Sequence, residues 1–264
     1  MKKRTSTSSE VITISRDAAR VPSELAEQFA SFARDVEETA AGLSGAGWAF
    51  ISTKGGEFKY KQEPLDSPLR VAIVGVAHEN TYYDKAFDPE STEPPKCTAI
   101  GRSQSTLAPP AEWPTKESES CKDCWANAWG SGRGRGKACA NRVRLCVVPI
   151  YKGVDVAKVE GARLRVPPTS LPNFNKLVAE VKALNNGVAN VFAHLVEVDL
   201  ESDPKTMFKM TFKVVGTFPE AVIRMLHSRI TEASGPLLQI FDPAASDDVE
   251  EARSKPKKQQ RGRR

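Results

Sequence analysis

The sequence predicts an α+β fold, in which a closed or nearly closed antiparallel β-barrel carries flanking helices and a cysteine-bearing loop insertion. Three observations lead to this prediction. At least six segments have the length and apolar pattern of β-strands, and helical periodicity lies mainly towards the margins of the chain. Between them, residues 88–120 are rich in Pro, Ser, Thr and Glu, which is typical of a long surface loop. Many strands with few helices favour an antiparallel barrel.

The first elements are expected in the following order. Residues 1–20 are Ser/Thr-rich and basic and predict a disordered N-terminal arm. A helix is expected from about Pro22 to Ala41, because apolar residues recur there at helical spacing. Strands are expected at 47–52, 58–61 and 69–76, with a turn at 54–57 between the first two.

The later elements complete a core domain over residues 21–242, with its loop at about 88–142. Apolar or alternating segments predict strands at 143–150 and 162–166, followed by a helix at 172–184. A hairpin is expected from 191–200 and 207–215, and a last helix at 219–231. Residues 243–264 are expected to form a disordered tail, acidic first and then basic.

Length and composition exclude several classes of protein. A chain of 264 residues can bury a sizeable core. It has no run of eighteen apolar residues to form a membrane span, and no apolar segment of a secretory signal follows its basic N-terminus. We therefore expect a cytoplasmic protein, whose five cysteines do not form a disulfide framework.

The net charge of +5 is distributed unevenly. Residues 253–264 carry seven basic and no acidic side chains, whereas five acids crowd together at Asp242, Asp247, Asp248, Glu250 and Glu251. Residues 120–145 hold six basic side chains against one acidic one. Such local basic patches are typical of proteins that bind polyanions, although a solvated surface with a basic tail is the alternative.

Four cysteines, with a C-x2-C pair at their centre, predict a structural zinc site. Thiolates two residues apart can turn towards one metal ion, and two more distant cysteines complete a tetrahedral set. A redox pair and four unrelated thiols are the alternatives. The expected ligands are Cys97, Cys121, Cys124 and Cys139.

The segment after the C-x2-C pair combines two tryptophans, several glycines and three cations. Single-stranded nucleic acids are bound in this way, because cations contact phosphates and aromatic rings stack on bases. A flexible loop with tryptophans packed on the metal site is the alternative. A second aromatic and basic set lies in the expected strands. The candidate nucleic-acid contacts are Arg133, Arg135, Lys137, Arg142, Arg144, Trp125, Trp129, Tyr60, Tyr82, Tyr83, Lys59 and Lys61.

The sequence offers little for catalysis. His78, His194 and His227 have no metal-ligand spacing, and neither G-x-S-x-G nor H-E-x-x-H occurs. We therefore expect a protein that is not an enzyme.

The segments 48–52, 79–84, 121–127 and 136–139 resemble those of phage-encoded single-stranded DNA-binding proteins of the oligonucleotide-binding (OB) type. The resemblance covers about residues 45–215 and implies an OB-like barrel. It also implies sequence-independent binding of single-stranded DNA, or of RNA, in phage replication or recombination, with replication or recombination proteins as possible partners. A basic end follows the acidic tail residues, which differs from the acidic tails common in such proteins.

The alternatives are a zinc-ribbon transcription or RNA-binding factor, a metal-dependent nuclease, and an interaction protein with a zinc-stapled loop. Oligomeric state is not indicated by the sequence.

Overall fold

The computed structural model describes residues 48–84, 94–132 and 134–240. The expected N-terminal arm, the expected helix at 22–41 and the expected tail at 243–264 lie outside the described residues. The elements described below belong to one compact unit that begins at Gly47.

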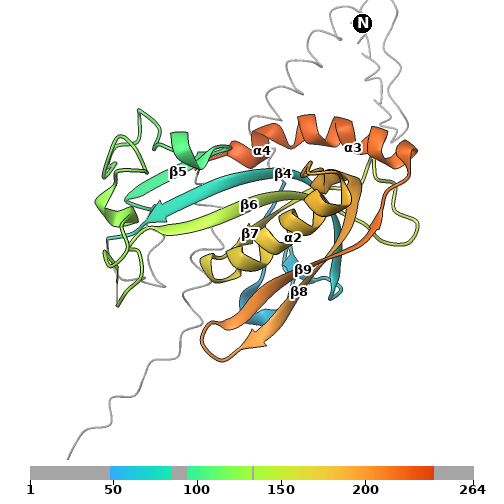
Figure 1. Cartoon of the computed structure of the whole chain (residues 1–264), viewed down its shortest axis with the longest axis horizontal. Helices are drawn as coiled ribbons and strands as arrows, with labels where there is room; N and C mark the ends of the chain where they lie inside the picture. The colour runs from blue at the N-terminus through green and yellow to red at the C-terminus, as the bar shows by residue number, and fades with distance from the viewer. Residues whose placement is uncertain (1–47, 85–93, 133, 241–264) are drawn as a thin grey trace, which may run out of the picture. The chain divides into compact units, whose positions relative to one another are not determined.

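The unit is built on two antiparallel sheets (Figure 1). The smaller sheet has the order β1-β2-β3, from β1 (Ile51–Ser52), β2 (Lys59–Tyr60) and β3 (Glu63–Pro64). The larger sheet has the order β7-β6-β4-β8-β9, and β5 also pairs with β4. Its strands are β4 (Leu69–Tyr82), β5 (Cys97–Gly101), β6 (Ala140–Pro149), β7 (Ala162–Val166), β8 (His194–Asp203) and β9 (Met207–Thr217).

Strand β4 is the longest strand and changes its partner along its length. Residues Leu69–Ala72 pair with β8, whereas His78–Tyr82 pair with β5. On its other side β4 pairs with β6 over nearly its whole length, with a register shift between Ile73 and Gly75. The strand therefore connects both ends of the larger sheet.

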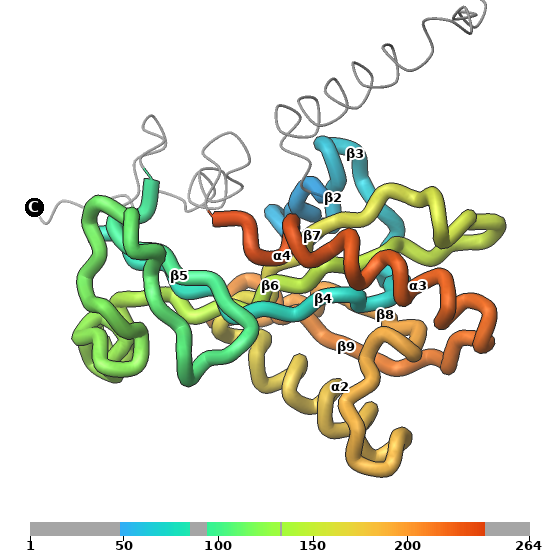
Figure 2. The backbone as a smooth tube through the Cα atoms, turned by 90° about the horizontal axis from the view of Figure 1, so that it is seen from above, coloured from blue at the N-terminus to red at the C-terminus, as the bar shows by residue number. Residues whose placement is uncertain are grey.

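Helices cover the two faces of the larger sheet (Figure 2). On one face α2 (Leu171–Leu184) buries Phe174, Leu177 and Val181 against Val71, Leu145 and other apolar residues of β4, β6, β8 and β9. On the opposite face α3 (Glu220–Glu232) and α4 (Ser234–Leu238) bury Leu226 and Leu237 against β4 and β6.

The covered faces explain the composition of β4. Residues 71–74 are all buried, because alternate side chains point into two separate cores. The apolar run that predicts a strand at 69–76 is thus confirmed as a strand with helices on both faces.

The expected α+β class and antiparallel pairing are confirmed, and so are the internal helix, the hairpin and the last helix. The expected barrel is not found, because the sheets formed by the described residues do not close. Alternating patterns identify strands and their faces but carry no information on whether the edge strands meet. No helix of the described residues is long and apolar enough to cross a membrane.

Gly161 provides a test of the packing between the first segment and β7. A Cβ atom at this position would lie 2.3 Å from ring atoms of the buried Trp48. We expect Gly161→Ala to lower the free energy of unfolding by about 1–3 kcal/mol, because the ring has to move. Urea unfolding followed by circular dichroism measures the change.

The control is Gly216→Ala, because nothing lies within 4 Å of a Cβ atom there. It should change stability by no more than about 0.5 kcal/mol. Equal stabilities of the two variants would contradict the close packing of Gly161 on Trp48.

Candidate nucleic-acid interface and cysteine cluster

A long loop connects β5 to β6 and contains three of the four expected zinc ligands. We call residues 102–139 the cysteine loop. Its regular structure, over the residues described, consists of two short 3-10 turns, at Gln104–Thr106 and Trp125–Asn127. The loop lies at the end of the sheet where β4 and β5 pair (Figure 1). Backbone hydrogen bonds fold it on itself, from Cys121 N to Leu107 O at 2.9 Å and from Cys139 N to Ala126 O at 2.8 Å.

The four expected ligands converge on one small cavity. Cys97 enters from β5, Cys139 immediately precedes β6, and Cys121 and Cys124 come from the loop between them. All four are free thiols, so no disulfide connects them. The other lining residues are Asn80, Tyr82, Ala99, Glu117, Ala126 and Asn127.

The four thiols share this cavity but do not form a metal-binding group in this structure. Within the described residues, no group of three or more His, Cys, Asp or Glu side chains has an arrangement that could hold a metal ion. Burial raises the pKa of the Cys97 and Cys121 thiols and raises that of Cys139 to about 12. Burial thus favours the neutral thiols over thiolates.

Two asparagines connect the cavity to the surrounding structure. Asn127 donates a hydrogen bond from Nδ2 to the carbonyl oxygen of Cys121 at 2.7 Å, and its Oδ1 accepts one from Lys137 Nζ at 2.9 Å. Asn80 Oδ1, on β4, accepts a hydrogen bond from Asn141 Nδ2, on β6, at 2.8 Å. Cys121, in the C-x2-C pair, is therefore held by a polar network that includes a lysine expected to contact phosphate.

The outer side of the cysteine loop exposes both tryptophans. Trp125 is 51% exposed and Trp129 is 81% exposed. The ring of Trp125 stands edge-on to Tyr82, with centroids 5.4 Å apart, and its Nε1 donates to Glu117 Oε2 at 2.7 Å. Trp129 lies beside Lys137, whose Nζ is 5.4 Å from the ring centroid. The alternative that the tryptophans bury themselves against the cysteines is therefore wrong.

Other cations lie in the cysteine loop or next to it. Lys96 Nζ forms an ion pair with Glu117 Oε1 at 2.7 Å and lies 6.0 Å from the centroid of Tyr82. Arg135 is exposed in the glycine-rich turn. Gly132 makes this turn tight, because a Cβ atom there would lie 2.6 Å from the Lys137 carbonyl. Arg133 lies outside the described residues.

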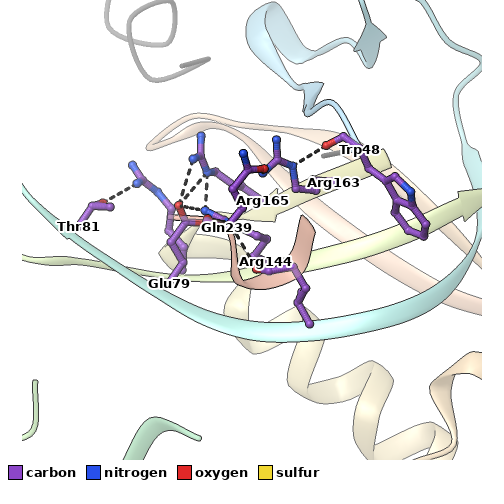
Figure 3. A network of polar contacts seen from close by, with 9 residues as sticks. Trp48, Glu79, Thr81, Arg144, Arg163, Arg165 and Gln239 are labelled. Atoms are coloured by element: carbon purple, nitrogen blue, oxygen red, sulfur yellow. Dashed lines mark hydrogen bonds and ion pairs between the residues drawn. The ribbon is translucent and has the colours of Figure 1, made fainter. Parts of the chain in front are cut away.

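Arg144 occupies a different place from the one expected for a phosphate contact (Figure 3). It is 1% exposed, and its Nε and Nη2 donate to the two oxygens of Glu79 at 3.0 and 2.8 Å. Its Nη1 donates to the carbonyl oxygens of Leu237 and Gln239 at 3.3 and 2.5 Å. Arg144 thus connects β6 to β4 and to the end of α4.

The same carboxylate of Glu79 holds a second arginine. Arg165 Nη2 lies 3.1 Å from Glu79 Oε1, and Arg142 Nη1 donates to Thr81 Oγ1 at 2.8 Å close by. Burial by itself would raise the pKa of Glu79, but Arg165 and Arg144 stabilise its charged form and lower the pKa to about 2. Sequence reasoning missed Glu79 and Arg165. The alternation of Arg163 and Arg165 with apolar residues was the available signal.

The second expected aromatic set lies on the smaller sheet. Tyr60 is half-buried and donates through its hydroxyl to the carbonyl oxygen of Gly161 at 3.4 Å. Lys61 forms an ion pair with Glu160 at 2.8 Å, and Lys59 forms one with Glu57 at 3.4 Å. Tyr83 is exposed next to the end of β4, near the cysteine loop and not near this set.

The histidines are not gathered into a site. His194 is buried between Asn185 Nδ2 at 2.7 Å and Thr217 Oγ1 at 3.3 Å, which connects the end of α2 to the end of β9. His227 is exposed on α3, and burial lowers the pKa of His78.

The chain matches no family model, and neither a curated protein nor a solved structure shows significant similarity to it.

The Glu79 carboxylate should be essential for stability. We expect Glu79→Gln to lower the free energy of unfolding by about 3–5 kcal/mol, because it leaves Arg144 buried without its ionic partner. Urea unfolding of the two proteins measures this difference. Glu197→Gln is the matched control, because Glu197 pairs with the exposed Arg70 at 2.9 Å. It should cost no more than about 1 kcal/mol.

The same group predicts how stability depends on pH. Because folding lowers the pKa of Glu79 from 4.5 to about 2, its contribution is present above pH 4.5 and is lost as the pH falls towards 2. The wild type should therefore lose more stability than Glu79→Gln between these values. Parallel acid titrations of the two proteins would contradict this assignment.

Proposed function

We propose that this chain is a non-catalytic protein that binds single-stranded DNA without sequence preference, through the outer side of the cysteine loop. The proposal rests on the exposure of Trp125 and Trp129 in a loop that also carries Lys137 and Arg135. Exposed tryptophans lose apolar contact with the core, and a nucleobase offers a flat partner for each ring.

The polar surroundings of the rings fit this role. Trp125 is held at one edge by Tyr82 and at its Nε1 by Glu117, so its orientation is set before a ligand arrives. A preorganised ring loses less entropy on binding. Lys137 and Arg135 lie in the turn that follows Trp129, where they can reach phosphates on either side of a stacked base. Lys96 adds a cation beside Tyr82.

We further propose that zinc, bound by Cys97, Cys121, Cys124 and Cys139, holds this loop in place. The support is that four free thiols, from three separate parts of the chain, line one cavity. This cavity lies beside the cysteine loop, which has little regular structure. Four thiolates form a closed structural zinc site. Binding would draw the sulfur atoms together and would deprotonate them.

The OB-like part of the proposal concerns the mode of binding. The described sheets are open, so we base the comparison with OB-type proteins on the use of an antiparallel sheet to carry an aromatic and basic loop. A role in phage DNA replication or recombination, in the cytoplasm of the host cell and with proteins of those processes as partners, belongs to the same proposal.

Removal of one stacking ring should weaken binding. We expect Trp129→Ala to reduce the affinity for poly-dT by about five- to a hundredfold, because a base–aromatic stack contributes about 1–3 kcal/mol. Titration followed by fluorescence anisotropy of labelled poly-dT measures the change. Tyr151→Ala is the control, since Tyr151 is 59% exposed beyond the other end of β6.

The affinity should also fall steeply with salt, with a log–log slope of about −0.7 for each phosphate contacted. Equal affinity of Trp129→Ala and wild type, or tighter binding of duplex than of poly-dT, would contradict the proposed binding mode. A preference for poly-U over poly-dT would identify RNA as the ligand in place of DNA.

Metal binding is tested separately. Native mass spectrometry of the purified full chain should find a single zinc ion in the wild type. Cys124→Ser should lose it, because this change removes one thiolate ligand. Cys146→Ser should retain it, because Cys146 is buried under α3 and α4, beside Ala233, and does not line the cysteine cavity. Absence of zinc from the wild type, or zinc retained by Cys124→Ser, would refute the metal site.

A further inference from the structure

Pairing of β6 with β7 gathers arginines on the face of the sheet opposite α2. Arg144 lies opposite Arg165, and Cys146 lies opposite Arg163. Because alternate residues of a strand share a face, Arg142 lies on this face as well. We call Arg142, Arg144, Arg163 and Arg165 the arginine row. Figure 3 shows the guanidinium groups of Arg144, Arg163 and Arg165 side by side over the sheet.

The ring of Phe50 brings three of these cations close together. The guanidinium carbons of Arg165, Arg163 and Arg144 lie 4.0, 4.2 and 5.2 Å from the ring centroid. Each distance is within the range of a cation–π interaction. An isolated bridge between Phe50 and Arg163 fixes this ring beside β7. The aromatic ring therefore serves as a common support for the arginines.

Among the described residues, Arg163 donates its hydrogen bonds only to neutral acceptors. Its Nε donates to the carbonyl oxygen of Trp48 at 2.5 Å, and its Nη1 donates to Gln239 Oε1 at 2.9 Å. In the described part of the chain, no carboxylate forms an ion pair with it. Burial lowers the pKa of Arg163 to about 10, and the charges of Arg144 and Arg165 add to this effect. The charge of Glu79 acts in the opposite direction, but one carboxylate does not balance three guanidinium groups, so a further anion would stabilise the charged form of Arg163.

The arginine row also reaches the surface. Arg144 is buried, but the side chain of Arg165 is 16% exposed and Arg142 is half-buried. Guanidinium groups present planar donors that match the oxygens of a phosphate. Arg165 and Arg142 could therefore contact an anion directly, while Arg163 adds positive charge beneath them.

We propose that Arg142, Arg165 and Arg163, supported by Phe50, form a second phosphate-binding site for the backbone of the same single strand. This inference rests on the proposed function and extends it to a residue set outside the cysteine loop. Its ligand class is a phosphodiester, and its binding requires no base.

The position of the arginine row suits single-stranded DNA that extends beyond the cysteine loop. Arg142 follows Cys139 by three residues, so the row begins where the cysteine loop rejoins the sheet. Arg165 lies opposite Arg144, about 13 Å along β6 from Ala140. Over the residues that the structure describes, β7 pairs with β6 only from Val143 onwards, so residues 140–142 have no partner strand on that side, and the proposed path of the nucleic acid passes there. A short oligonucleotide that occupies only the cysteine loop would not reach the arginine row.

The experiment compares oligo-dT of about 6 nucleotides with one several times longer, using the full chain at several salt concentrations. We expect Arg142→Gln and Arg165→Gln each to lower the affinity for the long oligonucleotide about three- to tenfold. Each should also reduce the log–log slope of this affinity against salt by about 0.7. Neither should change the affinity of the short one. Arg70→Gln, which removes an exposed arginine paired with a glutamate, should leave both affinities unchanged.

The use of two arginine variants allows for the loss of stability in one of them. Arg165 binds the buried Glu79, so its substitution can lower stability, whereas Arg142 donates to the hydroxyl of Thr81. Far-UV circular dichroism and urea unfolding show which variants remain folded, and the inference is judged on those. If folded Arg142→Gln and Arg165→Gln bind the long oligonucleotide as the wild type does, the second site is refuted.

The outcomes separate this inference from the proposed function. Trp129→Ala should lower the affinity for both oligonucleotides. If Trp129→Ala lowers the affinity but the two arginine variants do not, only the second site is refuted. A wild type that binds neither oligonucleotide refutes both proposals. Inorganic phosphate is the probe for a free anion. If the arginine variants lose affinity for phosphate but not for the long oligonucleotide, the site takes free phosphate and the inference is overturned.

Discussion

The buried carboxylate of Glu79 is the interaction on which the arrangement of the larger sheet depends. It lies on β4 and binds Arg144 from β6 and Arg165 from β7, so one side chain connects three strands. Arg144 continues from there to the carbonyl oxygens of Leu237 in α4 and of Gln239, which follows α4. Such a buried pair costs desolvation energy, and the added hydrogen bonds to carbonyl oxygens offset part of this cost.

The alternation of side chains along β4 places two kinds of chemistry back to back. Asn80 and Tyr82 line the cysteine cavity, whereas Glu79 and Thr81 bind arginines on the other face. A few consecutive residues therefore support both the thiol cluster and the arginine row. The proposed functions of the two faces are therefore coupled through the position of this one strand.

Local patterns in the sequence predict many of the helices and strands, but they do not predict how the strands pair. The strand at 162–166 and the helix at 172–184 are predicted because each has one clear period. Barrel closure and the split pairing of β4 depend on contacts between distant segments, which periodicity does not encode. Cysteine spacing predicts the cluster, since all four thiols line one cavity. Charge alone does not distinguish exposed Arg135 from buried Arg144, because only the pairing of β6 with β4 brings Glu79 beside Arg144.

The change of partner along β4 divides the sheet into two halves with separate supports. Its first residues lie between β6 and β8 under α2, and its last residues lie between β6 and β5 beside the cysteines. The packing of α2 on the first half therefore sets no limit on the length of the cysteine loop, whereas Glu79 in the second half fixes the strands that carry this loop. The architecture is in this sense modular, with a helix-packed base and a loop-bearing tip.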